Sequence, residues 1–285
     1  MRGARWRARG VSGPSRYASD KRFHALQTDP VWQDVAGNRR RIESMLDEHL
    51  AAGSIAQGDY VVAPEMCETA WTSDRAHLEV VRGSLEWIAA TARARQVWLQ
   101  AGFGEHTPEG GIANSVAVAA PDGDIRAIYR KNFLFPSERA SFVAGADIVV
   151  LDTGVAKVCP LICYDLRFPE LWRLAARAGA EVFAVGSSWP SVRHEHWRAL
   201  LLARAVENQA CLVAANRTGR DPAHEYAGGS VAITSLGERV DEARDEVRCV
   251  TLPFDRAAFD SWRAKFGALR DTRDALLGSI ATRRV

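Results

Sequence analysis

Hydrophobic and polar positions follow two rhythms along the chain between residues 22 and 255. Short, mostly apolar runs predict buried β-strands, at 23–27, 60–64, 97–103, 148–153, 157–163, 181–188, 211–217, 229–235 and 248–255. Apolar residues three or four positions apart predict helices, at 35–52, 74–95, 168–179 and 194–209. Strands and helices therefore alternate over almost the whole chain.

A polar turn adds a hairpin to this alternation. The sequence Pro-Asp-Gly-Asp at 121–124 joins two strand-like segments, 114–120 and 125–131. Buried strands that alternate with helices, together with a hairpin, predict an α/β sandwich with mixed sheets in one domain. No linker, low-complexity tract or short repeat divides residues 22–255.

The amino-acid composition indicates which kinds of partner the chain can be expected to bind. The 285 residues are 47% apolar and 25% charged, the balance of an ordinary globular protein. The 37 basic and 35 acidic residues leave a formal charge of +2, which gives no global indication of nucleic-acid binding. No apolar run approaches the roughly 20 residues needed to span a bilayer. We therefore expect neither a nucleic-acid nor a membrane partner.

The five cysteines are an odd count in a chain too large to need disulfides for stability, which favours a reducing, cytoplasmic compartment. In an extended segment, Cys159 and Cys163 would lie about 13 Å apart, at about 3.3 Å per residue. That separation exceeds the roughly 7 Å limit for a disulfide. The thiols are therefore expected to be free.

The two ends of the chain differ from its middle. Residues 1–20 hold five arginines and lack the apolar stretch of a secretory signal. We interpret them as a disordered extension or the result of an upstream start codon, with a transit peptide as the alternative. The folded domain is expected over 21–258, and 259–285 as a C-terminal extension that could pack on a partner subunit.

Candidate chemistry begins at the sequence PLICYDLRFPELWR, where a predicted strand ends at Cys163 and a helical pattern follows. A tight turn at such a joint projects the side chain out of the sheet, and the helix N-terminus favours a thiolate. The alternative is that Cys163 is a small buried hydrophobic residue. A nucleophilic thiol needs a base and a cation beside it.

Two residues at similar joints could supply those groups. Glu65 follows a predicted strand, where a carboxylate is partly desolvated and suited to a general base. Lys131 ends the second strand of the predicted hairpin. Taken singly, each is more often a solvated charge at the rim of a sheet or a salt-bridge partner.

Three blocks of sequence, taken together, resemble the nitrilase superfamily of carbon–nitrogen hydrolases. APEMCETAW is similar to the family's Glu block, YRKNFLFPSER to its Lys block and ICYDLRFPELWR to its Cys block. The blocks occur in the family's order, and Cys163 follows Lys131 by 163 − 131 = 32 residues. The resemblance covers about residues 23–255.

The resemblance implies a four-layer αββα sandwich, an oligomer, and catalysis without metal or cofactor. In such a protein Cys163 would be the nucleophile, Glu65 the general base and Lys131 the stabiliser of tetrahedral intermediates. The backbone N–H of Tyr164 would complete the oxyanion hole. Glu138, in SERASFVAG, matches a second glutamate that would orient the lysine or relay a proton.

The segment SSWPSVRHEHWRALLLARAVENQ is similar to the ω-amidase branch, which hydrolyses amides of 2-oxo acids such as 2-oxoglutaramate. An anionic substrate needs a cation, for which Arg193 and Arg167 are the candidates, with Trp189 as a wall. The alternatives are that Arg167 pairs with Asp165 or Glu170, and that Arg193 lies on the surface.

Other readings stay open. The chain could belong to another branch, an N-carbamoyl amide hydrolase or a nitrilase, or be a catalytically silent scaffold on the same fold. Cys67 is a fallback nucleophile close to Glu65. His194, His196 and His224 could suggest a metal, but the first two are spaced two apart on a predicted helix and point to different faces. Capping and packing are the expected roles of these histidines.

Overall fold

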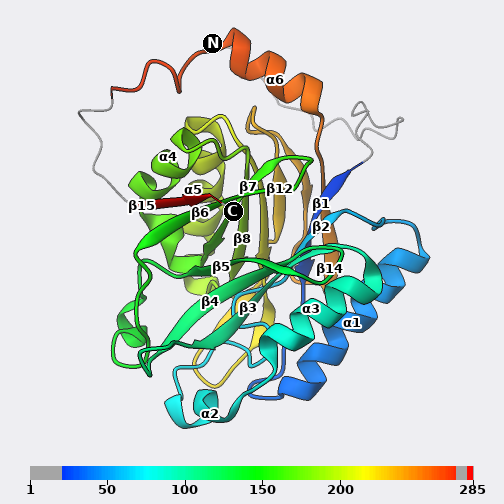
Figure 1. Cartoon of the computed structure of the whole chain (residues 1–285), viewed down its shortest axis with the longest axis vertical. Helices are drawn as coiled ribbons and strands as arrows, with labels where there is room; N and C mark the ends of the chain where they lie inside the picture. The colour runs from blue at the N-terminus through cyan, green and yellow to red at the C-terminus, as the bar shows by residue number, and fades with distance from the viewer. Residues whose placement is uncertain (1–20, 274–280, 285) are drawn as a thin grey trace, which may run out of the picture.

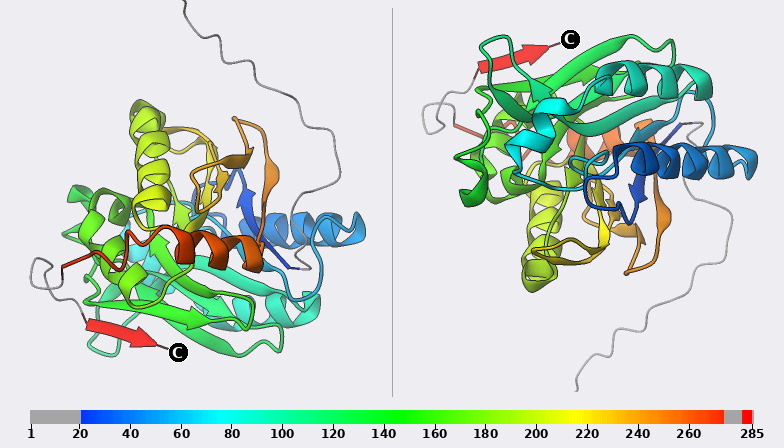
Figure 2. Two further views of the ribbon diagram at one scale, coloured as in Figure 1. Left: turned by 90° about the horizontal axis from the view of Figure 1, so that it is seen from above. Right: turned by 90° about the horizontal axis from the view of Figure 1, so that it is seen from below.

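A computed structural model describes residues 21–273 and 281–284. Two mixed β-sheets lie face to face with helices outside each of them, as Figures 1 and 2 show. This arrangement confirms the predicted α/β class and the four-layer αββα sandwich. The Arg-rich extension expected over 1–20 lies outside the described residues.

The first sheet has six strands, in the order β14 (Arg248–Pro253), β1 (Arg22–Gln27), β2 (Tyr60–Val62), β3 (Trp98–His106), β4 (Ile112–Ala119) and β5 (Ile125–Arg130). Strands β1, β2 and β3 run parallel, and the remaining pairs are antiparallel. The predicted hairpin is thus β4–β5. Helices α1 (Val35–Ala51) and α3 (Ser84–Arg95) cover the outer face.

The second sheet has seven strands, in the order β13 (Arg239–Glu242), β12 (Val231–Ile233), β9 (Cys211–Asn216), β8 (Val182–Ser187), β7 (Lys157–Ile162), β6 (Asp147–Asp152) and β15 (Ala281–Arg284). Strands β7, β8 and β9 run parallel. Helices α4 (Pro169–Arg177) and α5 (His194–Glu207) cover its outer face. A separate two-stranded hairpin joins β10 (Thr218–Arg220) to β11 (Glu225–Ala227).

The predicted helix over 74–95 is wrong, because the structure has two helices there. They are α2 (Arg75–Val80) and α3, separated by an extended Val81 and by Gly83 at φ +72°. The left-handed backbone at Gly83 ends one helical path and starts another. The two halves of the apolar stripe also enter different clusters, with Leu78 beside Ile112 and Ile88 beside Leu99.

The C-terminal part of the chain adds a helix that the sequence pattern did not reveal. Helix α6 (Arg256–Lys265) includes the expected domain boundary at residue 258. Its Phe259 is buried against Phe254, and Arg263 donates to the carbonyls of Ala180 and Gln209. The first part of the expected extension therefore packs on its own chain. Within the described residues, no helix is long and apolar enough to cross a membrane.

Candidate active site

Cys163 lies at the end of β7, where the chain turns sharply into the short 3₁₀ helix η2 (Cys163–Arg167). Its φ of +42° is in the left-handed region, which costs a non-glycine residue about 1–3 kcal/mol. The buried carboxylate of Asp165 holds this turn. It accepts hydrogen bonds from the hydroxyl of Tyr129 at 2.8 Å and from the backbone N–H groups of Ile162 at 3.1 Å and Phe133 at 3.0 Å.

Three buried charged groups meet at the ends of strands of the first sheet. Glu65 follows β2, Lys131 follows β5, and Glu138 ends the short helix η1 (Pro136–Glu138). The ammonium of Lys131 donates to Oε1 of Glu65 at 2.7 Å and lies 2.9 Å from Oε2 of Glu138. All three side chains are almost inaccessible to solvent. The lysine is therefore held between two carboxylates.

An amide that the sequence reading missed connects the same two carboxylates. Nδ2 of Asn114 donates to Oε1 of Glu65 at 2.8 Å and to Oε1 of Glu138 at 2.7 Å. The Ser188 N–H donates to Oε2 of Glu65 at 3.0 Å, and the Trp71 indole donates to Oε1 of Glu138 at 3.1 Å. The signal that could have revealed Asn114 is an amide at the start of the strand-like run NSVAVAA.

The protonation of the cluster follows from its charges. Burial opposes the charge of Lys131, but the Glu65 and Glu138 carboxylates outweigh it and raise the pKa of the ammonium, which stays protonated. Burial, reinforced by Glu65, raises the pKa of the Cys163 thiol well above its usual range, although Lys131 lowers it. The expected thiolate-favouring effect of the helix end is thus outweighed by desolvation. The resting thiol is protonated and needs a base to become a nucleophile.

A cavity opens over this cluster, and we call it the Cys163 pocket. Cys163, Glu65 and Lys131 line it, whereas Glu138 does not and is fully buried. The other lining residues are Trp71, Phe135, Tyr164, Arg167, Ser188, Trp189, Pro190, Arg193, His224 and Tyr226. The set includes Arg167, Arg193 and Trp189, which the sequence suggested for substrate binding, and Tyr164, which it suggested for the oxyanion hole. A thiol, a carboxylate and an ammonium in one pocket suit nucleophilic attack on a carbonyl.

The sequence offered Asp165 and Glu170 as alternative ion-pair partners of Arg167. Within the described part of the chain, Arg167 forms no ion pair with either. Its guanidinium lies instead over the Trp189 ring, 4.8 Å from the centroid, and its Nη2 is 3.3 Å from Nδ1 of His196. Arg167 therefore faces the pocket with a positive charge that no carboxylate of the described residues neutralises.

Arg193, the second candidate cation, is partly buried rather than lying free on the surface. Its guanidinium lies 5.3 Å from the centroid of the Phe135 ring. Its backbone carbonyl accepts a 2.7 Å hydrogen bond from the Trp189 indole, which fixes the turn to the pocket wall. Among residues 21–273 and 281–284, Arg193 also lacks a carboxylate partner.

Comparison with known proteins assigns the family. The sequence model of the carbon-nitrogen hydrolase family matches residues 24–264 of this chain. The chain belongs to that family. It is 30% identical over 257 residues to Omega-amidase YafV of Yersinia enterocolitica, covering 88% of this chain and 96% of that protein. It is 34% identical over 237 residues to a 2-oxoglutaramate amidase of Bacillus subtilis, covering 81% and 89%.

Solved structures agree with the assignment to the carbon-nitrogen hydrolases. XC1258 from Xanthomonas campestris, a superfamily member with an arsenic adduct in its active site, superposes with a TM-score of 0.81 at 30% identity. The match covers 90% of this chain and 98% of that one. The chain is therefore a hydrolase of non-peptide carbon–nitrogen bonds, and the resemblance read from the three sequence blocks is confirmed.

The Cys163 pocket of this carbon-nitrogen hydrolase does not include Cys67, His194 or His196. Cys67 is buried in the core, its thiol is 3.4 Å from the carbonyl of Gly102, and burial raises its pKa. The described residues contain no group of His, Cys, Asp and Glu arranged to hold a metal ion. His224 nevertheless lines the Cys163 pocket, together with Tyr226. The sequence reading missed this role because it did not predict the β10–β11 hairpin.

Proposed function

We propose that the chain is a thiol amidohydrolase of the ω-amidase type, which converts the amide of a 2-oxo acid such as 2-oxoglutaramate to the carboxylic acid and ammonia. The observation that carries the proposal is a single pocket that contains Cys163, Glu65, Lys131 and two arginines, for which residues 21–273 and 281–284 provide no carboxylate partner. The names of the Yersinia and Bacillus relatives support the same substrate class.

The first half of the reaction forms a thioester. Glu65 takes the thiol proton of Cys163, and the sulfur attacks the amide carbonyl to form a C–S bond. The oxyanion of the tetrahedral intermediate is stabilised by the Lys131 ammonium and the Tyr164 N–H. When the C–N bond breaks, protonated Glu65 gives its proton to the leaving nitrogen, which departs as ammonia. The raised pKa of Lys131 keeps its stabilising charge in place throughout.

The second half releases the acid. Glu65 takes a proton from water, the resulting oxygen nucleophile attacks the thioester, and the C–S bond breaks. The proton returns from Glu65 to the sulfur of Cys163, so the enzyme regains its starting state. Glu138 acts through Lys131, which it contacts at 2.9 Å, and keeps the ammonium oriented between the two carboxylates.

Recognition of an anionic substrate falls to Arg167 and Arg193. A carboxylate that enters the pocket replaces water around these guanidinium groups and forms charge-assisted hydrogen bonds. Trp189 supports the Arg167 guanidinium with its ring and holds the backbone of Arg193 through its indole N–H, so the Arg167 cation and the turn that carries Arg193 are positioned before substrate arrives.

An ammonia-release assay tests this substrate class. We expect the largest kcat/KM for ω-amides of 2-oxo acids, with smaller values for glutamine, N-carbamoyl amino acids and nitriles. Arg193→Ala should lower kcat/KM about 10- to 100-fold on carboxylate-bearing amides, and by no more than about threefold on neutral amides. Equal losses on both would remove Arg193 from substrate recognition. Preferred hydrolysis of carbamoyl compounds or nitriles would place the chain in another branch of the family. A separate labelling of the thiols with iodoacetamide tests for a catalytically silent scaffold, which slow, uniform alkylation of all of them would favour.

We also propose a homodimer or higher homo-oligomer that works in the cytoplasm. Val206 and Leu236 are exposed, and Val206 and Leu202 of α5 lie against Gly237, which follows Leu236, so these residues offer an apolar area that a second copy could cover. The five cysteines are all free, as a reducing compartment requires. Light scattering tests the first point, because Val206→Glu should dissociate the oligomer.

A further inference from the structure

The β10–β11 hairpin brings a second group of side chains to the Cys163 pocket. His224, directly before strand β11, and Tyr226, within that strand, both line the pocket. Strand β11 also packs against the short helix η3 (Ser191–Arg193), which carries Arg193. Neither ring nitrogen of His224 has a hydrogen-bond partner in the described part of the chain. This wall is therefore next to the proposed carboxylate site and has polar groups free for a ligand.

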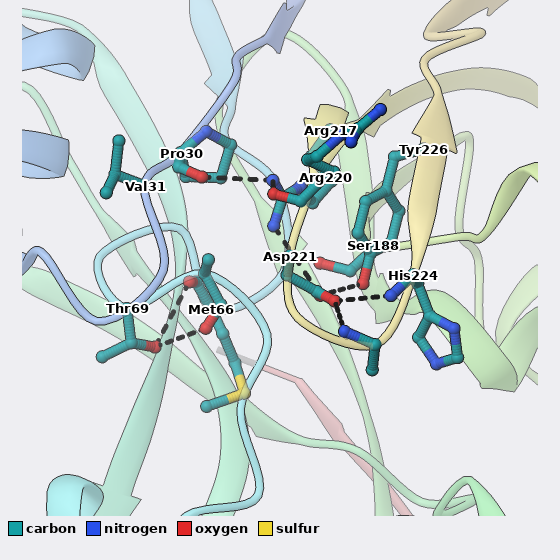
Figure 3. Close-up of polar contacts among 12 residues, drawn as sticks. Pro30, Val31, Met66, Thr69, Ser188, Arg217, Arg220, Asp221, His224 and Tyr226 are labelled. Carbon is teal, nitrogen blue, oxygen red and sulfur yellow. Dashed lines mark hydrogen bonds and ion pairs between the residues drawn. The ribbon is translucent and has the colours of Figure 1, made fainter.

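Asp221 connects the two pocket residues of the hairpin, as Figure 3 shows. Its Oδ1 accepts hydrogen bonds from the backbone N–H groups of Ala223 at 2.8 Å and His224 at 2.7 Å. Its Oδ2 accepts a hydrogen bond from the Tyr226 hydroxyl at 2.5 Å. Burial raises the pKa of Tyr226, so the hydroxyl keeps the proton that it donates. One carboxylate thus fixes the backbone at His224 and the ring position of Tyr226.

Arg217 anchors this arrangement from behind. Its side chain is fully buried, and its guanidinium lies 4.3 Å from the centroid of the Tyr226 ring and 3.9 Å from Oδ2 of Asp221. Nη2 donates to the carbonyls of Pro30 at 3.1 Å and Arg220 at 3.0 Å. The hairpin is therefore attached to the loop after β1 and cannot move without exposing or unpairing a buried charge.

We propose that Arg217 and Asp221 are positioning residues that fix His224 and Tyr226 as the specificity-determining wall of the Cys163 pocket. This inference rests on the proposed function. A substrate whose carboxylate binds the arginines and whose amide must reach Cys163 has to fit a fixed length, and the wall limits where its acyl chain can lie. The wall selects ω-amides by chain length, distinguishing a five-carbon from a four-carbon 2-oxo acid amide. A pocket can discriminate one methylene by about 10- to 200-fold.

The test compares kcat/KM for these two amides in four variants. Tyr226→Phe keeps the ring and removes the hydroxyl, and Asp221→Ala removes all three acceptor contacts. Both should reduce the ratio of the two kcat/KM values about tenfold, mainly through KM. Asp221→Asn keeps an acceptor for the backbone and should restore part of the ratio. Arg220→Ala is the matched control, since Arg220 is on the same hairpin but pairs with Glu225 in solvent.

Alkylation of Cys163 by iodoacetamide separates the wall from the chemistry. We expect its rate to stay within about twofold in Tyr226→Phe, because Asp221 and Tyr226 do not contact the thiol. A wild-type enzyme that hydrolyses ω-amides, with an unchanged chain-length ratio in Tyr226→Phe and Asp221→Ala, would overturn the specificity wall alone. Equal losses of kcat for both amides would likewise reduce Asp221 to a structural role. Failure of the wild type on both amides would overturn the proposed function itself.

Discussion

Two buried cysteines of this molecule have similar exposure and very different surroundings. Cys163 is 9% exposed and Cys249 is 8% exposed. Cys249 has the partners of a familiar catalytic triad, because its sulfur is 3.8 Å from Nδ1 of His24, whose Nε2 is 3.1 Å from Oδ2 of Asp59. Cys163 instead shares its pocket with a lysine and a glutamate.

Residue types alone would favour Cys249 as the nucleophile, and the geometry favours Cys163. Cys249 lies within β14 and is not part of the Cys163 pocket. Nδ1 of His24 is also 3.1 Å from the Thr251 hydroxyl, which competes for the ring nitrogen. Cys163 has a strained turn that projects its side chain into a cavity beside a base. Access and backbone geometry therefore decide which thiol can react.

Removing the two thiols in turn is the strongest test of the comparison between Cys163 and Cys249. If Cys163 is the proposed nucleophile, Cys163→Ala should lower kcat by at least about 10⁴-fold, the loss typical of removing a catalytic nucleophile. Cys249→Ala should leave kcat within about twofold, because its thiol does not contact substrate. Steady-state ammonia release measures both. A large loss in Cys249→Ala with folding intact would invert the comparison.

Removing the Lys131 ammonium tests how the buried cluster of Glu65, Lys131 and Glu138 differs from ordinary ion pairs. Lys131→Met leaves two buried carboxylates uncompensated, which should destabilise the fold by about 3–5 kcal/mol and abolish turnover. Arg75→Met is the control, since its pair with Glu79 is half exposed and should contribute less than about 1 kcal/mol. Urea denaturation gives both values. Similar losses in the two variants would mean that the cluster is not held together by its charge.

A substitution at Asn114 tests how Glu65 is positioned. Asn114→Ala should lower kcat about 10- to 100-fold, since each hydrogen bond to a charged group contributes about 1.5–3 kcal/mol. Asn208→Ala removes another buried amide, which donates to the carbonyl of Arg204 and does not line the Cys163 pocket, and should change stability only. A kcat in Asn114→Ala equal to that of the control would show that Lys131 and the Ser188 N–H are enough to position Glu65.

The smallest expected effect belongs to the His24 cluster and concerns stability. Burial lowers the pKa of His24 from 6.5, so the folded state holds the ring neutral while the unfolded chain takes up a proton below that pH. The free energy of unfolding should therefore rise with pH up to about 6.5 and then level off. His24→Gln should flatten the slope between pH 5 and 6.5 without changing kcat. Thermal unfolding across this range measures it, and an unchanged slope would mean that other groups cause the pH dependence.

The sequence predicted the residues at strand ends better than those that meet across the fold. Glu65, Lys131 and Cys163 each follow a recognisable apolar run, and three sequence blocks are enough to suggest that they converge. Asn114 and Tyr226 were missed because their roles depend on contacts with residues distant in the chain. The break at Gly83 was missed because an apolar stripe continues across it, although its halves pack in different clusters.

The central claim is that Cys163 forms a thioester with the acyl group of the substrate. Acid quenching of a reaction with 2-oxoglutaramate, followed by proteolysis and mass spectrometry, tests it directly. We predict that the peptide containing Cys163 gains the mass of the acyl group, that Cys249 stays unmodified, and that the adduct disappears as acid is released. Rapid turnover with the acyl group on another residue, or with Cys163 replaced by alanine, would contradict the account.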